Sequence, residues 1–363
     1  MTARRVALLL GASVLVIVLA TWMSSKGHTE RGTLAGDPVL SGLDKSSLNS
    51  VTEIRLSKGD GTRTTLKKGG TGWSVGERDY PADSGKVRKL LLDLAALNVV
   101  EEKTSLPDNY PLLGVEEVSS AKATGTRVDA VTPARTYSLI VGKSSGAKSG
   151  FVRVSNSPRS LLAAPLITVD ADPRRWLDHS LIDIAQERMK EIAVKPAQGP
   201  AYTASRTSKD QPDYTVAEIP KGRELSSPAA ADPIAGSLGS LSLDDVQHAP
   251  AAAPAGVSHA IFKTFDGLEI DVAGRKDGTR TLIALAPRSS AKETEAEAQA
   301  LEARLKGWEF EIPSYKYDGM FRPLEDLLKK PPEPPAKGAK TGGKDSGKTG
   351  AAKDTPTGPL LSK

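Results

Sequence analysis

The sequence predicts an α+β protein with two similar halves in tandem, and three observations carry this prediction. Short apolar strands are joined by tight turns such as Asp60-Gly61, which is typical of hairpins and not of parallel strands. Each half also contains a stretch with the apolar spacing of a helix. Finally, VTEIRL from Val51 and MKEIAV from Met189 open two series of elements in the same order. We therefore expect two mainly antiparallel sheets, each with a packed helix.

The N-terminal residues predict a transmembrane helix at residues 6–23, behind a cytoplasmic segment at residues 1–5. The run contains no charge, and at about 1.5 Å per residue it nearly spans a hydrocarbon core of roughly 30 Å. Arg4 and Arg5 precede it, so the positive-inside rule sends the following residues across the membrane. Cleavage of a signal peptide near Ala20 is the alternative. With either an uncleaved anchor or a cleaved signal peptide, we expect the body of the protein to be periplasmic. An uncleaved anchor would hold it at the cytoplasmic membrane through lipid contacts of residues 6–23.

Composition separates the ends of the chain from its body. Residues 24–46 are polar and Gly-rich and predict a stalk, and residues 329–363 are rich in Lys, Pro and Gly and predict a disordered tail. The net charge of +5 comes from Arg4, Arg5 and an excess of three lysines over acids in residues 331–363, so the chain between them is neutral. A neutral body argues against nucleic acid as a partner. The chain has no cysteine, which excludes disulfides, thiolate metal sites and a cysteine nucleophile.

The first half, residues 47–187, begins with a hairpin around Asp60-Gly61 and a strand that contains Trp73. Asp83 or Ser84 then caps a helix, because apolar residues recur at spacings of three and four as far as Leu97, and the helix ends near Asn98. Three strands follow, at residues 127–130, 135–141 and 151–154. The half closes with DPRRWLDHSLIDI, residues 172–184.

The second half, residues 188–328, is expected to repeat this order. Asp232-Pro233 begins a weaker helix that carries Ile234, Leu238 and Leu241. Strands are predicted at residues 260–264, 268–272 and 279–285, and a helix at residues 291–306 leads into the alternating strand WEFEI. The closing YDGMFRPLEDLL is matched to the end of the first half, with residues 324–327 corresponding to residues 181–184.

Residues 137–146 fit two known motifs in part, a hydrolase nucleophile motif and a phosphate-binding loop, but they also fit an ordinary hairpin loop. Gly142-Lys143-Ser144-Ser145-Gly146 fits the pattern of a hydrolase nucleophile, but a strand follows where that motif needs a helix. A phosphate-binding loop would require glycine at Tyr137. The four histidines show no metal-ligand spacing. We therefore predict a hairpin loop at residues 142–146, and no catalytic, cofactor or metal residues.

One charged group stands out as a candidate site. Arg174 and Arg175 lie close in sequence to Asp178 and Asp183, and Glu187 follows. These side chains predict a structural network that pins the end of one half to the start of the next. The alternative is a site for an anion such as sulfate or a sugar acid. His179 in the same stretch raises a further question, whether the segment is an active site or a joint.

Several phrases together resemble a bacterial family of unknown function numbered 4340. They are YPADSGKVRKLLLDLAALNVVE, NYPLLGVEE, LIVGK, DPRRWLDHSLIDI and GWEFEIPSYKYDGMFRPLEDLL. The resemblance covers about residues 47–328. It implies a membrane-tethered protein whose partners are ABC transporter permeases or auxiliary envelope proteins of the gliding-motility type. It carries no catalytic residue over to this chain.

The sequence thus predicts a non-enzymatic, membrane-anchored extracytoplasmic accessory or scaffold protein of an ABC-type transport system. The main alternative is a module that binds envelope glycan or a small anion in the groove between the halves, since pockets are common at domain interfaces. An envelope hydrolase is a third reading, which would require Ser, Asp and His to converge in space.

Overall fold

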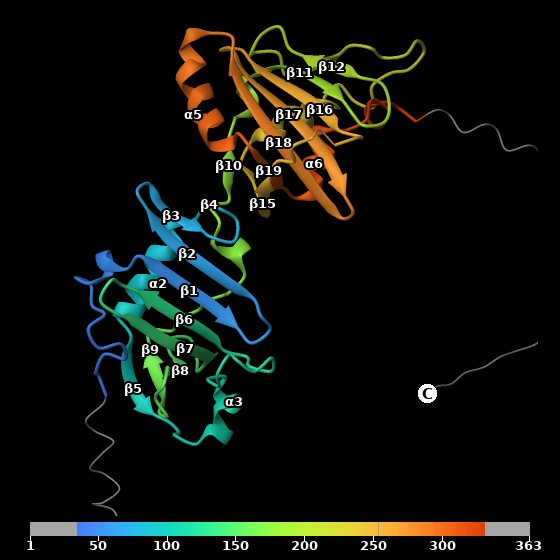
Figure 1. The fold of residues 1–363 in the computed structure, drawn as a ribbon. Coiled ribbons are helices and arrows are strands. Elements are labelled where there is room, and N and C mark those ends of the chain that lie inside the picture. The colour runs from blue at the N-terminus through green and yellow to red at the C-terminus, as the bar shows by residue number, and fades with distance from the viewer. Residues whose placement is uncertain (1–34, 253, 331–363) are drawn as a thin grey trace, which may run out of the picture.

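A computed structural model of the protein describes residues 35–252 and 254–330, which form two lobes (Figure 1). The predicted membrane span at residues 6–23 and residues 331–363 of the predicted tail lie outside the described residues, whereas Lys329 N–H donates to the Glu224 carbonyl at 2.9 Å. Within the described residues, no helix is long and apolar enough to cross a bilayer. The predicted architecture of antiparallel sheets with few helices is confirmed.

The first lobe, residues 35–178, is built on a nine-stranded antiparallel sheet in the order β4-β3-β2-β1-β6-β7-β8-β9-β5. Its strands are β1 (Glu53–Lys58), β2 (Arg63–Gly69), β3 (Gly72–Val75), β4 (Tyr80–Pro81), β5 (Asn98–Glu102), β6 (Thr126–Val131), β7 (Thr136–Ser144), β8 (Gly150–Val154) and β9 (Ser160–Ala164). Its helices are η1 (Leu48–Ser50), α2 (Ser84–Ala95), η2 (Pro107–Asn109), α3 (Tyr110–Leu113) and η3 (Pro173–Trp176).

The second lobe, residues 179–330, is built on an eight-stranded antiparallel sheet in the order β13-β12-β11-β16-β17-β18-β19-β15. Its strands are β11 (Met189–Lys195), β12 (Tyr202–Ser205), β13 (Thr215–Val216), β15 (Asp245–His248), β16 (Ser258–Thr264), β17 (Leu268–Asp277), β18 (Arg280–Ser289) and β19 (Trp308–Glu311), and β10 (Ser180–Ile182) pairs with β14 (Leu241–Ser242). Its helices are η4 (Gln186–Arg188), α4 (Asp232–Ala235), η5 (Gly236–Leu238), η6 (Lys292–Thr294), α5 (Glu295–Leu305), α6 (Ser314–Met320) and η7 (Leu324–Leu327).

The two large sheets have the same strand order once β4 is set aside. In chain order, β1, β2, β3, β6, β7, β8 and β9 occupy the positions of β11, β12, β13, β16, β17, β18 and β19, and β5 and β15 are the matching edge strands. All of these neighbours are antiparallel. The two lobes therefore share one topology.

The lobes also end in a similar way, although not in the register that the sequence suggested. The η3 and η7 turns are each followed by an extended residue, Leu177 and Leu328, that forms an isolated β-bridge with Ala82 and Leu225, respectively. Residues 324–327 therefore correspond to residues 173–176. The predicted match to residues 181–184 was wrong. It rested on a similar order of Leu and Asp residues, whereas the β-bridges of Leu177 and Leu328 fix the correspondence between the two lobes.

Local sequence explains where α2 begins and which face it buries. The Asp83 carboxylate accepts hydrogen bonds from the backbone N–H groups of Gly85 and Lys86, at 2.9 and 3.0 Å, and so caps the first turn. The predicted N-cap is therefore Asp83, not Ser84. The apolar stripe packs against the sheet through Val87, Leu90, Leu91 and Leu94. The helix ends at Ala95, earlier than predicted, because Asn98 already belongs to β5.

Two other predictions need correction. The stalk was predicted to reach residue 46, but Val39, Leu40 and Leu43 are buried, and Val39 N–H donates to the Leu97 carbonyl at 2.9 Å. The helix predicted from Asp232 ends at Leu238, and Leu241 lies in β14. Gly236 and Gly239 interrupt that segment, which lowers its helix propensity.

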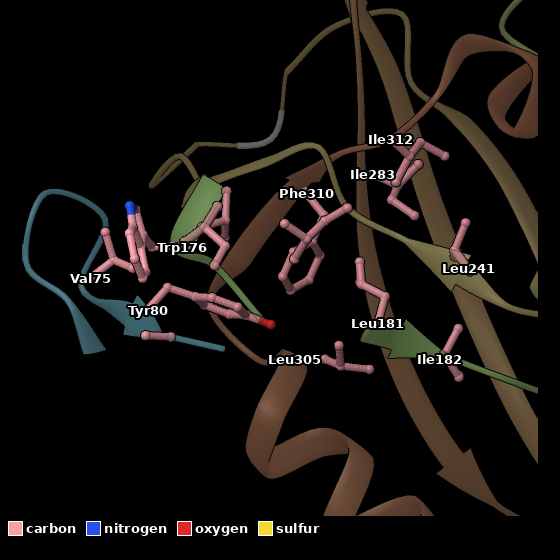
Figure 2. Close-up of a cluster of buried hydrophobic side chains, with 14 of the residues drawn as sticks. Val75, Tyr80, Trp176, Leu181, Ile182, Leu241, Ile283, Leu305, Phe310 and Ile312 are labelled. Atoms are coloured by element: carbon pink, nitrogen blue, oxygen red, sulfur yellow. The ribbon is translucent and has the colours of Figure 1, made fainter. Parts of the chain in front are cut away.

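The cores of the two lobes are continuous. One cluster of buried apolar side chains extends from the first sheet through Trp176 and Leu181 into the second sheet. Figure 2 shows Tyr80 of the first lobe between Val75 and Trp176 on one side and Phe310 of the second lobe on the other. A second, smaller cluster of Tyr110, Val115 and Ile140 lies beneath α3. The lobes are thus joined by buried side chains as well as by the chain itself.

Candidate functional site

The segment at residues 172–184 passes from one lobe to the other. In its first part, Trp176 is buried and its indole N–H donates to the Asp170 carbonyl at 2.8 Å. Asp178 N–H donates to the Pro81 carbonyl at 3.0 Å, and Asp83 N–H donates to the Trp176 carbonyl at 2.8 Å. These bonds fix the segment to the first lobe as far as Asp178.

From His179 onward the same segment belongs to the second lobe. The His179 Nδ1–H donates to the Leu243 carbonyl at 2.7 Å, and Leu243 N–H donates to the His179 carbonyl at 3.0 Å. The Leu181 carbonyl accepts a hydrogen bond from the Arg304 guanidinium. The lobe boundary therefore lies between Asp178 and His179, ahead of the predicted boundary at residue 187. The imidazole of His179 is used to hold two chain segments together.

Of the four candidate network residues, Arg174, Arg175 and Asp178 lie on the first-lobe side of this crossing and Asp183 lies on the second-lobe side. Arg174 forms an ion pair with Asp172 at 2.7 Å, and this contact lowers the pKa of the Asp172 carboxyl. Asp178 accepts from Ser180 N–H at 3.1 Å, and Asp183 accepts from Ser240 N–H at 2.6 Å. In the part of the chain that the structure describes, neither Asp178 nor Asp183 forms an ion pair with Arg174 or Arg175.

A groove with a volume of about 440 Å³ lies between the lobes. The turn between β3 and β4 forms its first-lobe wall, and β15 with the start of β18 forms its second-lobe wall. It is lined by Gly76, Glu77, Arg78, Asp79, Asp245, Val246, Gln247, His248 and Arg280. Most of these side chains carry charge, so the groove has the composition expected for a polar ligand.

The cations in and behind the groove already have carboxylate partners. Arg78 binds Asp245 across the lobes through two hydrogen bonds of 2.6 and 2.9 Å, and these bonds raise the pKa of the Arg78 guanidinium. Arg280 donates to Glu311 at 2.6 Å and to the Gln247 side-chain oxygen at 3.1 Å. A polar ligand in the groove would have to displace these contacts.

A second layer of paired charge lies behind the groove. Arg275 binds Glu309 through two hydrogen bonds of 2.9 and 2.7 Å. Gln247 also donates to Glu309, at 2.9 Å. The bonds from Arg275 hold the pKa of the buried Glu309 carboxyl below its usual value. The Glu309 carboxylate is therefore held in its ionised form by its structural partners.

Aromatic rings of the two lobes pack against each other beside the groove residue His248. Tyr80 of the first lobe contacts Trp308 and Phe310 of the second lobe edge to face, with ring centroids 5.4 and 6.0 Å apart. His248 stacks on Trp308 at 4.2 Å. Burial raises the pKa of the Tyr80 hydroxyl to about 12, so this group stays protonated near neutral pH. These rings act as packing between the lobes.

A second pocket, of about 410 Å³, lies beside α2 and contains the remaining candidate residue, Arg175. It is lined by Lys86, Lys89, Leu90, Asp93, Leu166, Thr168, Asp170, Arg175 and Trp176. Lys89 pairs with Asp93 at 2.6 Å. Within residues 35–252 and 254–330, the Arg175 guanidinium forms no ion pair or hydrogen bond. Of the four predicted network residues, Arg175 alone presents a free charge to this pocket.

The two motifs considered from sequence lie elsewhere. Residues 142–144 end β7, and the chain turns through residues 145–149 into β8, with Ser145 N–H donating to the Ser149 carbonyl at 2.8 Å. The predicted hairpin is confirmed, but its turn comes later than predicted. No group of three or more His, Asp or Glu side chains in the described residues could hold a metal ion. Sequence reasoning missed Arg78, Asp245 and Glu309. No local spacing signals these residues, because their partners lie far away in the chain.

Comparison with known families identifies the chain. The family model described as "Domain of unknown function (DUF4340)" matches residues 73–259, which is more than half of the sequence. The chain belongs to the DUF4340 family. Comparison with curated proteins and with solved structures gave no significant match.

The DUF4340 match begins in β3 and ends in β16, so it crosses from the first lobe into the second. It includes the whole segment at residues 172–184, both halves of the Arg78–Asp245 pair, and the pocket at Arg175. The region matched by the DUF4340 family is therefore not a single lobe but the junction with the strands on either side of it.

Proposed function

We propose that this DUF4340 protein is a non-enzymatic, membrane-anchored accessory or scaffold protein on the extracytoplasmic side of the cytoplasmic membrane. In this proposal it associates with an ABC-type transport system of the cell envelope. Residues 6–23 provide the anchor, and the two lobes provide a surface for a permease or an auxiliary protein. The proposed partner follows from the family resemblance, which points to transport systems of this kind.

The observation that carries the proposal is the junction, where charged side chains pair with each other. Arg78, Arg275 and Arg280 each bind a carboxylate at 2.9 Å or less, and His179 binds a backbone carbonyl. A catalytic centre needs polar groups that are free to meet a substrate. Groups that are saturated by one another instead fix the relative position of two lobes. A fixed two-lobed body suits a scaffold.

Crosslinking in intact membranes tests this proposal. Because the chain has no cysteine, a single cysteine at the exposed Tyr315 can carry a photoactivated crosslinker without competing labels. We expect crosslinked products to contain permease or auxiliary subunits of a transport system, above the level found with the cysteine-free parent. The same label at exposed Leu92 of the first lobe extends the survey to the other lobe. Recovery of no transport or envelope protein at either position would contradict the proposal.

A second candidate function is the binding of a small anion, and the position of Arg175 favours it. The expected groove between the lobes is occupied by ion pairs, whereas the pocket beside α2 contains the unpaired Arg175 guanidinium next to the buried Trp176. The other two cations of its lining, Lys86 and Lys89, are paired with Asp83 and Asp93. A carboxylate, sulfate or sugar acid would find its counter-charge there. This candidate places the anion in the pocket of the first lobe instead of between the lobes.

Thermal stability in the presence of anions tests the second candidate. Sulfate and glucuronate should raise the melting temperature of the wild type by mass action, and Arg175→Ala should abolish this shift. Arg174→Ala is the matched control, because Arg174 is paired with Asp172 outside the pocket lining. An equal shift in wild type and Arg175→Ala would rule this pocket out as the anion site.

A further inference from the structure

Exposed apolar side chains gather at one end of the first lobe. In the part of the chain that the structure describes, the large apolar residues with high exposure are Leu92, Val100, Leu106, Leu112 and Tyr315, and three of these lie between residues 100 and 112. Leu106 is 64% exposed and Leu112 is 70% exposed. Pro107 and Pro111 beside them are also exposed, as is the charged Asp108 between them. We call Leu106, Pro107, Pro111 and Leu112 the apolar tip.

The apolar tip is held in place by contacts on its inner side. Tyr110 is buried, its hydroxyl donates to the Pro158 carbonyl at 2.5 Å, and the guanidinium of Arg153 lies over its ring. Lys143 donates to the carbonyls of Pro111 and Leu112 at 3.1 and 3.0 Å. These contacts fix the segment in a position in which Leu106 and Leu112 face outward. An exposed apolar group on a fixed segment indicates a surface that something else covers.

The position of the chain's entry into the fold indicates what covers it. Gly36 N–H donates to the Val99 carbonyl, and Val99 N–H donates to the Asp37 carbonyl, so the start of the described chain runs beside β5. From there β5 leads into η2 and α3, at the end of the first lobe that faces away from the second lobe (Figure 1). The apolar tip and the entry of the chain are thus on the same end of the molecule.

The length of the connection to the anchor limits the distance of this end from the membrane. Only residues 24–34 separate the proposed span from residue 35. Even fully extended, at about 3.3–3.6 Å per residue, this connection reaches at most about 40 Å. The end of the first lobe that carries the apolar tip is therefore within reach of the bilayer surface.

We propose that the apolar tip inserts into the interfacial layer of the same bilayer that holds the anchor. Leu106 and Leu112 are the inserting side chains, and the two contacts with the membrane, anchor and tip, fix the orientation of the lobes above it. The occupant of this surface is lipid: shallow apolar insertion beside a tether requires no specific protein pocket. This inference rests on the membrane anchor of the proposed function.

Site-directed spin labelling of the full chain in phosphatidylcholine vesicles tests the proposal. Leu112→Cys and Tyr315→Cys each give a single labelling site in a cysteine-free chain, and Tyr315, 71% exposed on the second lobe, is the matched control. Flotation after an alkaline wash first establishes that the chain is anchored. We expect the label at position 112 to collide more with oxygen than with an aqueous nickel chelate, and the label at position 315 to show the reverse.

The outcomes separate the inference from the proposed function. If the chain does not float with the vesicles, the anchor is absent and both are overturned. If it floats but the label at position 112 is as accessible to the nickel chelate as the label at position 315, the inference alone is overturned. If the label at position 112 is aqueous in lipid vesicles and shielded from both reagents only in native membranes, a protein covers the tip, and the lipid proposal is again overturned.

Discussion

At the scale of single residues, the contact that most directly links the lobes is the Arg78–Asp245 pair. Both side chains are partly buried, with 29% and 15% of their area exposed, and the guanidinium binds the carboxylate with two hydrogen bonds. This pair is more buried and better aligned than an ordinary surface ion pair. In an ordinary surface pair, screening by solvent and the loss of side-chain entropy cancel most of the attraction. A measurable coupling energy is therefore expected.

A double-mutant cycle measures this coupling. With Arg78→Ala, Asp245→Ala and the double variant, urea unfolding should give an interaction energy of about 1–2 kcal/mol. The exposed Lys276–Asp318 pair is the control, with side-chain exposures of 58% and 59%, and its cycle should give about 0.5 kcal/mol or less. Equal coupling energies for the two pairs would mean that the cross-lobe contact does not stabilise the junction.

The lowered pKa of the Glu309 carboxyl predicts how the stability of the protein depends on pH. The bonds from Arg275 lower its pKa in the folded state, so folding favours the ionised form. This contribution is complete above the unfolded pKa, near 4.5, and is lost as the pH falls through the folded pKa. The destabilisation caused by Glu309→Gln should therefore be largest at neutral pH and shrink toward pH 3 in urea titrations.

The pKa of the Asp244 carboxyl is shifted in the opposite direction from that of Glu309, so its effect on stability has the opposite sign. Partial desolvation raises the pKa of the Asp244 carboxyl, with a further contribution from the nearby Glu311, so the ionised form opposes folding. Asp244→Asn should stabilise the protein at neutral pH, and this gain should disappear in acid. If Glu309→Gln and Asp244→Asn shift stability in the same direction at pH 7, the electrostatic account of this region is wrong.

At the scale of elements, local sequence predicts the hairpins and the start of α2, because turns and caps depend on residues close together. The cap can be tested directly. Asp83→Ala removes two hydrogen bonds to the first turn and should cost about 1 kcal/mol of unfolding free energy. Ser84→Ala, at the neighbouring exposed position, should change it by less than about 0.5 kcal/mol. If Ser84→Ala lowers the unfolding free energy more than Asp83→Ala does, Ser84 and not Asp83 is the N-cap.

Other elements could not be predicted, because distant partners decide them. Val39 and Leu40 look like stalk residues in sequence, and only the unsatisfied edge of β5 explains why they fold back. The Asp232 carboxylate accepts from Tyr214 N–H at 3.2 Å instead of capping a long helix. Similarly, Arg174 has a carboxylate two residues away, whereas Arg78 and Asp245 are 167 residues apart. Sequence reasoning found the segment at residues 172–184 but not the residues that it meets.

At the scale of the whole molecule, a continuous core predicts that the lobes unfold together. Calorimetry of the wild type should show one transition, because the buried apolar cluster is continuous through both lobes and the Tyr80 ring contacts Trp308 and Phe310 of the second lobe (Figure 2). Tyr80→Ala removes contacts with Trp308 and Phe310 and should separate this transition into two. Tyr110→Ala, in the small cluster beneath α3, should lower the transition temperature without dividing it. Two transitions in the wild type would contradict a rigid junction.

The central claim is that residues 172–184 form a joint and not an active site, and His179 tests it most directly. His179→Ala removes the bond to the Leu243 carbonyl, so the free energy of unfolding should fall by about 1 kcal/mol. Well below the melting temperature, the yield of partner crosslinks in intact membranes should match that of the wild type. If the variant is as stable as the wild type but forms no crosslinks, His179 acts in function itself, and the claim is wrong.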